Sequence, residues 1–489
     1  MKYRSGSALP AVMVSLIILF FGCVPSDINM GFVDLEEDGT PAITYRLYAE
    51  AGSDLILSIP SDLSIDDTQI AMVYQYAEEI PHCRYSSGDP VPIQLAEICI
   101  LYDQYYLFPE YLPDTLDSIA DVGAYVDDVR RSDRYTFYYT PEAYAEYKLF
   151  REGDASHIGF SYRCEETVVS DQAPFLIDEI YPFTRAWIDG LRAEDIILAV
   201  NGNRIGGLAV ESVTDMFPSQ EGEAVDLLIQ RDGQEITIST AAEEHIVQLL
   251  APGTAYISVR SFTRYTGEIV KQDFQQLQAD APDPIENVIL DLRDNPGGSN
   301  AGMLQLIDYL IDRDLPAGTN PIMTLDGSYY HNQTVYLGDY DAENIGSFSK
   351  TAFVVLVDAS SASASEITTA VLKYYSAATV MGVQTYGKGV SQFVFELLDG
   401  AGVWITAHYV YPPDGISFHQ IGVSPDYVVT DSPASFSQDP LLEKATAFLE
   451  TGEIPAAESS REQLGRPDIV QKAGDPLAER FTVRGEGWK

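Results

Sequence analysis

Ser363, Lys388 and Gln392 are the residues of this chain whose types and spacing could do chemistry. Ser363 is the middle serine of Ser361-Ala-Ser-Ala-Ser-Glu366, Lys388 follows 25 residues later, and Gln392 comes four residues after that. A serine hydroxyl attacks a carbonyl carbon only when a base removes its proton, and a lysine kept neutral in an apolar pocket can be that base. These residue types could therefore supply a nucleophile, a base and a glutamine that holds the amine in place.

The lysine base sets a condition on its surroundings. An exposed lysine titrates near pH 10.4, whereas a base that works at neutral pH needs a pKa of about 7 to 8. That shift of roughly 3 units corresponds to about 4 kcal/mol, which burial or nearby positive charge can supply. We therefore expect an apolar pocket around Lys388, although the chain has a formal net charge of −45.

The serine run has a second interpretation as a helix start. Ser363 and Glu366 form the S-x-x-E pattern of a capping box. Apolar residues follow at helical spacing, namely Ile367, Ala370, Val371 and Tyr374. The two roles of Ser363 are compatible, because a helix N-terminus presents backbone N–H groups where an oxyanion would form.

The segment around Lys388 also resembles a phosphate-binding loop. Gly382 to Gly389 nearly matches G-x-x-x-x-G-K-[ST], but Gly389 stands where a hydroxyl should bind magnesium. A phosphate loop opens a helix, whereas Val390 to Glu396 alternates as a strand does. We therefore do not expect nucleotide binding.

A histidine base stays an alternative, because a Ser-His-Asp triad is defined by geometry rather than by sequence order. His408 and His419 lie nearest to Lys388 in sequence among the six histidines. His408 falls in an alternating segment typical of a strand. His419 falls in a turn-rich stretch, where it could contact substrate.

On these residues the chain resembles the carboxyl-terminal processing proteases, serine peptidases of the tail-specific type. In that family the serine is the nucleophile, the lysine is the base and the glutamine supports it, at these spacings. The segment Asp291-Leu-Arg-Asp-Asn-Pro-Gly-Gly298 looks like the family's D-L-R-x-N-P-G-G. The resemblance implies that the N–H groups of Gly298 and Ala364 form the oxyanion hole.

The resemblance extends to a peptide-binding domain. Residues 156–246 resemble a PDZ domain, in which His157-Ile158-Gly159-Phe160 looks like the carboxylate-binding loop. PDZ domains capture a peptide by strand addition, so the resemblance implies that Ile158, Gly159 and Phe160 bind a protein C-terminus. Ala186 to Gly202 matches the usual D-x-I-L-x-V-N-G stretch, although Glu194 replaces a glycine. The alternative is a PDZ domain that only rigidifies the chain.

The expected fold class is α/β. Strand and helix patterns alternate through the core, and the resemblance, which covers about residues 100 to 430, implies a crotonase-like α/β catalytic core. A PDZ domain, β-rich with two helices, and an N-terminal β/helical region precede it. The expected boundaries are a signal peptide at 1–23, an acidic tether and small β-rich region at 24–100, a helical lead-in at 101–150, the PDZ domain at 156–246, the core at 250–435, and a C-terminal helix and polar tail at 436–489.

The N-terminus is typical of an export signal. Lys2 and Arg4 precede an apolar run of 14 residues, which is shorter than the about 20 that span a membrane. Phe20-Phe-Gly-Cys23 resembles a bacterial lipobox, with phenylalanine in place of the usual leucine. This implies lipidation of Cys23 and a periplasmic or cell-surface lipoprotein anchored to a bacterial membrane. An uncleaved anchor and ordinary secretion are the alternatives.

The composition of the chain limits the classes of partner that we expect it to bind. The net charge of −45 argues against nucleic acid and against electrostatic docking to an anionic membrane face. We expect protein or peptide substrates bound by their C-termini, contact with the membrane through the lipid anchor only, and no metal or organic cofactor. Cys83 and Cys99 could form a disulfide in an oxidising compartment. A homo-oligomer and an activating adaptor stay open.

The sequence thus predicts an exported serine endopeptidase with a Ser/Lys dyad that recognises protein C-terminal tails. The alternative from another class is a catalytically inactive peptide-binding adaptor or scaffold of the same fold. The intact set of Ser363, Lys388 and Gln392 argues against that alternative.

Overall fold

The computed structural model describes most of the chain from residue 91 onward. The signal segment with Cys23, the acidic tether, His157 and the tail beyond Glu453 lie outside the described residues, so the expectations about them stay predictions. The described residues are 57–58, 80, 82–87, 91–152, 158–218, 220, 222–243, 245–311, 319–327, 331–339, 352–430, 433 and 436–453.

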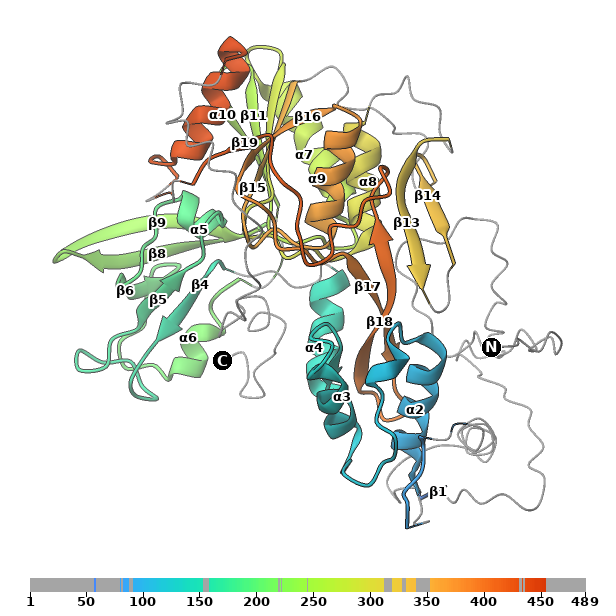
Figure 1. The fold of residues 1–489 in the computed structure, drawn as a ribbon. Helices are drawn as coiled ribbons and strands as arrows, with labels where there is room; N and C mark the ends of the chain where they lie inside the picture. The colour runs from blue at the N-terminus through green and yellow to red at the C-terminus, as the bar shows by residue number, and fades with distance from the viewer. Residues whose placement is uncertain are drawn as a thin grey trace, which may run out of the picture.

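A six-stranded sheet forms the centre of the core (Figure 1). Its order is β10-β11-β12-β15-β16-β19, with β10 antiparallel to β11 and the other neighbours parallel. Parallel neighbours need long crossover connections, which helices supply, so the core has the predicted α/β fold. The strands are β10 (His245–Ala251), β11 (Thr254–Val259), β12 (Asn287–Asp291), β15 (Ala352–Val357), β16 (Ala378–Gly382) and β19 (Tyr427–Val428).

Helices cover both faces of this sheet, because successive side chains of a strand point to opposite faces. In β11, Ile257 packs in the cluster that contains residues of α7, α8 and α9, whereas Tyr256 packs in the cluster that contains residues of α10. Figure 1 shows α10 on the side opposite the other three. The helices are α7 (Thr266–Asp280), α8 (Asn300–Leu310), α9 (Ala364–Tyr374) and α10 (Pro440–Thr451).

A second sheet joins the core to the lead-in. Its order is β14-β13-β18-β17, and β3 of the lead-in also pairs with β18. Helices α2 and α3 share a buried cluster with Phe395, Val403 and Ile405 of this sheet. The elements are β1 (Leu57–Ser58), β2 (Val91–Pro92), α2 (Ile93–Tyr105), η2 (Pro109–Tyr111), α3 (Val122–Arg130), β3 (Phe137–Tyr139), α4 (Pro141–Glu152), β13 (Pro321–Gly327), β14 (Gln333–Tyr336), β17 (Val390–Glu396) and β18 (Gly402–Tyr411).

A third sheet with two short helices lies between the lead-in and the core in sequence. Its order is β4-β5-β6-β8-β9, with β7 beside β6, and it has a buried cluster of its own around Phe175, Ile177 and Leu227. The elements are β4 (Phe160–Arg163), β5 (Leu176–Ile180), α5 (Arg185–Ile188), β6 (Ile196–Val200), β7 (Asn203–Arg204), α6 (Val210–Thr214), β8 (Glu223–Arg231) and β9 (Gln234–Ala242).

The structure differs from the sequence-based expectation in the N-terminal region. The sequence predicts a β-rich region up to residue 100, but α2 already begins at Ile93, and β1 and β2 have two residues each. Most of α2 is buried, and a helix that is apolar nearly all round carries no helical period. Cys83 and Cys99 are buried free thiols, so the structure contains no disulfide between them.

Among the described residues, the search for a helix long and apolar enough to span a bilayer finds none.

Candidate active site

Ser363 occupies the turn between β15 and α9. It is partly exposed, and its backbone has φ 56° and ψ −114°. A non-glycine residue in such a conformation is strained, which is common at functional turns. The N–H of Ser363 donates to the Glu366 carboxylate at 2.9 Å, and α9 begins at the next residue, so the predicted helix start is confirmed.

Glu366 joins the turn of Ser363 to the turn of Lys388. Its fully buried carboxylate accepts hydrogen bonds from the N–H groups of Ser363 (2.9 Å), Lys388 (2.7 Å) and Gly387 (2.7 Å) and from the Thr385 hydroxyl (2.6 Å). The first two donors bind the same oxygen, Oε2, so the two backbone nitrogen atoms lie no farther apart than these two distances together. The structure thus brings the predicted nucleophile and the predicted base to one place.

The side chain of Lys388 ends between two aromatic rings. Its Nζ atom lies 5.6 Å from the ring centroid of Tyr135 and 5.8 Å from that of Trp404. Burial lowers the pKa of Lys388 to about 8, although the carboxylates of Asp133 and Glu366 act in the opposite direction. The surroundings of Lys388 therefore lower its pKa toward the range that a lysine base needs at neutral pH.

The other candidates from the sequence lie on the second sheet and its connections. Gln392 is on β17 opposite Thr406 of β18, and its Nε2 is buried without a hydrogen-bond partner among the described residues. Burial lowers the pKa values of His408 and His419 to about 4. A base with so low a pKa is poorly matched to neutral pH, which favours Lys388 over either histidine.

The glycine turn after β12 packs directly against Ser363. A Cβ added to Gly297 would lie 2.8 Å from the Ser363 Cβ and 2.9 Å from the Ala364 nitrogen. The next glycine, Gly298, has φ 134°, and a Cβ there would lie 2.2 Å from the carbonyl oxygen of Phe262. Only glycine fits at either position. The glycine turn, which carries the Gly298 N–H, therefore adjoins the serine turn, which carries the Ala364 N–H at the start of α9.

Asn295 connects the glycine turn to the serine turn through hydrogen bonds. Its side chain accepts from the Gly297 N–H (2.8 Å) and donates to the Val259 carbonyl (2.7 Å). Its own carbonyl accepts from the Ala362 N–H (2.9 Å) and the Ser365 hydroxyl (3.0 Å). Because the Gly297 amide is engaged by Asn295, Gly298 is the amide of this turn that matches the predicted oxyanion donor.

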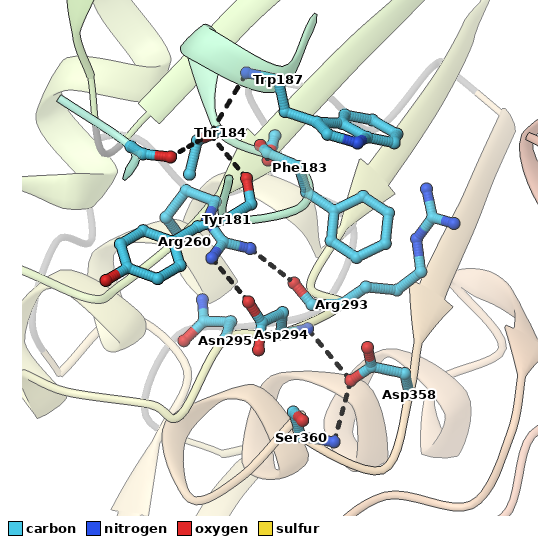
Figure 2. A network of polar contacts seen from close by, with 12 residues as sticks. Tyr181, Phe183, Thr184, Trp187, Arg260, Arg293, Asp294, Asn295, Asp358 and Ser360 are labelled. Atoms are coloured by element: carbon cyan, nitrogen blue, oxygen red, sulfur yellow. Dashed lines mark hydrogen bonds and ion pairs between the residues drawn. The ribbon is translucent and has the colours of Figure 1, made fainter. Parts of the chain in front are cut away.

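A buried polar network continues from this turn toward the third sheet (Figure 2). The carboxylate of Asp358 accepts from the N–H groups of Asp294 (3.0 Å) and Ser360 (2.9 Å). Arg260 donates to the Arg293 carbonyl (3.2 Å) and to the Asp294 carboxylate (2.8 Å). The strand ends that carry the glycine turn and the serine turn are therefore cross-linked by charged side chains.

Arg293 ties three parts of the chain together. Its guanidinium pairs at 2.6 Å with Asp291, which ends β12, and at 2.6 Å with Asp439, which caps α10. The same group lies 4.0 Å from the ring centroid of Phe183, in the connection between β5 and α5. Both carboxylates and the guanidinium are almost fully buried, so the guanidinium offsets part of the cost of burying the two negative charges.

The predicted peptide-binding loop enters the third sheet. Gly159 has φ 87°, its carbonyl accepts from the Tyr181 N–H (3.0 Å), and a Cβ there would lie 2.6 Å from the Thr184 hydroxyl. Ile158 packs partly against the cluster of this sheet. Phe160 is buried, with its ring edge-on to Phe217 at 5.5 Å. The structure thus separates this loop from Ser363 and Lys388 and places it at β4, an edge strand.

Several residues of the site received no catalytic role from sequence reasoning. Glu366 was predicted only as half of a capping box, and Asn295 only as part of a longer matching segment. Asp358 carried no signal. The described residues contain no group of three or more His, Cys, Asp or Glu side chains that could hold a metal ion.

The chain is similar to several known proteins. Residues 253–429 match the model of peptidase family S41. The chloroplastic C-terminal processing peptidase of Tetradesmus obliquus is 27% identical over 339 residues, which cover 64% of this chain and 67% of that protein. The carboxy-terminal-processing protease of Bartonella bacilliformis is 26% identical over 328 residues, which cover 65% and 69% of the two chains.

Among solved structures, the photosystem II D1 C-terminal processing protease matches with a TM-score of 0.41 and 22% identity, over 69% of this chain and 93% of that one. The matched residues of the present chain contain the whole of the serine turn, the glycine turn and the lysine turn. The predicted resemblance is thereby confirmed: residues 253–429 match peptidase family S41, and the chain is similar to carboxyl-terminal processing proteases.

Proposed function

We propose that this chain is a serine endopeptidase in which Ser363 is the nucleophile and Lys388 the general base. The observation that carries the proposal is the shared Glu366 oxygen, which binds the backbone of both residues. The aromatic pocket supports the role of Lys388 as a base, because burial lowers the pKa of this lysine to about 8. Roughly a tenth of the amine is then neutral at pH 7, far more than for an exposed lysine, and the neutral form is the one that acts as a base.

The proposed reaction begins with attack of the Ser363 Oγ on the carbonyl carbon of the scissile bond. Its proton moves to Lys388 Nζ, and the carbonyl electrons move to the oxygen, which the N–H groups of Gly298 and Ala364 stabilise. Collapse of this intermediate breaks the C–N bond, and the Lys388 ammonium returns the proton to the leaving amine. Water then releases the acyl group by the same steps.

The third sheet suits the proposed role of a PDZ domain, and the core would be of the crotonase-like type. An edge strand with a glycine loop at its start can receive a peptide by strand addition. In this proposal the Ile158–Phe160 backbone holds the C-terminal carboxylate of a protein tail. Phe160 supplies the strand and the packing rather than an exposed ring, since its side chain is buried. Export and lipidation of Cys23 complete the proposal and rest on the sequence alone.

Two substitutions test the dyad. Ser363→Ala should abolish cleavage of a peptide substrate while the thermal unfolding midpoint stays near that of the wild type. Lys388→Arg should abolish cleavage as well, because arginine remains protonated. A matched control is Lys373→Arg, at a partly exposed lysine on α9 that pairs with Asp426. Normal turnover by Lys388→Arg would refute the lysine base. Peptide binding without cleavage by the wild-type protein would favour the scaffold alternative.

A further inference from the structure

Asp133 lies next to Tyr135, whose ring forms one side of the Lys388 pocket. It belongs to a turn of the lead-in, outside the residues that match the family. Its backbone N–H donates to the Val129 carbonyl at the end of α3 (3.0 Å). Its Oδ1 accepts from the Tyr135 N–H (3.1 Å), and the ring of Tyr135 faces the Lys388 ammonium. The residue is 4% exposed, so its carboxylate is held in a fixed position.

Two neighbours of Asp133, Arg134 and Thr136, contact other residues around the same pocket. The Thr136 hydroxyl donates to the Trp404 carbonyl (2.6 Å), and the ring of Trp404 is the second wall of the pocket. The Arg134 guanidinium lies 5.0 Å from the ring centroid of Tyr386, two residues before Lys388. The four residues from 133 to 136 are therefore fixed relative to the lysine.

Two carboxylates act on Lys388, and they differ in their bonding. Glu366, on α9, is saturated by four hydrogen bonds. Asp133 keeps one oxygen, Oδ2, buried and without a hydrogen-bond partner among the described residues. Burial raises the pKa of Asp133, whereas the hydroxyls of Thr406 and Tyr106, which face it as hydrogen-bond donors, lower that pKa. The Tyr102 hydroxyl also lies near Asp133, and Arg134 and His419 contact the ring of Tyr135. Asp133 is thus bonded less tightly than Glu366, and its carboxylate is the one more available to a positive charge in the pocket.

We propose that Asp133 is a positioning residue for Lys388 and that its carboxylate stabilises the ammonium formed when Lys388 takes the proton of Ser363. The inference rests on the proposed function. A charge that appears in an apolar pocket is costly unless it is paired. A fixed carboxylate nearby offsets that cost, as the carboxylate of a catalytic triad does for its histidine.

The proposal has a definite sign. A carboxylate favours the charged form of a lysine, so removal of the charge in Asp133→Asn should lower the pKa of Lys388. The acidic limb of the pH profile of kcat/KM should move to lower pH by roughly 1 unit. The kcat at the high-pH plateau should fall as well, because the base is weaker and its ammonium is no longer paired.

A control separates this effect from general damage. Asp127→Asn removes an exposed carboxylate of α3, the helix that precedes Asp133, and should leave the limb in place. Asp133→Glu should restore the limb toward the wild-type pH. If Asp133→Asn lowers the rate while its limb stays at the wild-type pH, the role of Asp133 is only structural and the proposal is refuted.

A direct titration keeps the test independent of turnover. Lysine labelled with 13C at Cε, with the Lys388 signal assigned by Lys388→Arg, reports the pKa of Lys388 in the inactive Ser363→Ala background. Addition of Asp133→Asn should lower that pKa, and an unchanged value would overturn the proposal.

The protein with Asp133 intact gives a second reading, which stands even if Asp133→Asn does not fold. In that protein the Lys388 signal should show a second, smaller step at acidic pH as Asp133 titrates. A single step would overturn the proposal. If Ser363→Ala retained cleavage activity, the proposed function would fail, whereas the electrostatic link between Asp133 and Lys388 would still be decided by the titration.

Discussion

The substitution Glu366→Gln tests the arrangement that brings Ser363 and Lys388 together. The carboxylate accepts four hydrogen bonds of 2.6 to 2.9 Å, two on each oxygen. The amide of glutamine has the same shape but keeps only one accepting oxygen, and its NH2 group would face two donors. Each buried donor left without a partner costs about 1 to 3 kcal/mol, so the variant should lose about 2 to 6 kcal/mol of unfolding free energy.

The same change should damage catalysis more than binding. Two N–H groups that repel the new amide displace either the serine turn or the lysine turn, and a shift of about 1 Å in such a site costs on the order of 100-fold in rate. We therefore expect a fall in kcat of that order with a smaller change in KM, measured with a peptide substrate. Urea unfolding followed by circular dichroism gives the free energy. Glu268→Gln, at an exposed position of α7, is the control. A Glu366→Gln protein with wild-type kcat and unfolding midpoint would show that the carboxylate does not organise the site.

Three further predictions concern the proposed dyad. Because burial lowers the pKa of Lys388 to about 8 and the neutral amine is the active form, kcat/KM should rise about tenfold per pH unit below pH 8 and level off above it; a profile that is flat between pH 6 and 8 would contradict this. Gly298→Ala should lower kcat by about 10² to 10³-fold, since its Cβ would meet the Phe262 carbonyl at 2.2 Å, whereas Gly206→Ala, which has open space around it, should behave as wild type. Gln392→Ala should reduce kcat without abolishing it, and a complete loss of activity in a folded protein would give the glutamine a larger role than support.

The features of the site that depend on residues close together in the sequence could be predicted, and those that depend on how distant turns meet could not. The spacing of Ser363, Lys388 and Gln392 and the glycines at 297 and 298 are local patterns, so they could be read directly. The S-x-x-E pattern likewise predicted the start of α9. The role of Glu366 toward Lys388 could not be read, because it depends on how two turns meet after folding.

The aromatic pocket was predicted as a physical requirement but not as particular residues. Tyr135 and Trp404 are brought together by the pairing of β3 with β18, and the hydrogen bond between Thr136 and Trp404 spans 268 residues of sequence. No periodicity along one segment indicates such a contact. Helix α2 was missed for a different reason, since its burial on nearly all sides removes the helical period on which such a prediction depends.

The pairing of β3 with β18 also has a consequence for biosynthesis. The residues that line the base come from positions 135, 366, 388 and 404, so a growing polypeptide cannot assemble them until almost all of it has left the ribosome. Contacts this distant along the chain form late, because a long loop must close first. In the proposed mechanism, a truncated or half-made molecule would therefore contain the serine without a competent proton acceptor.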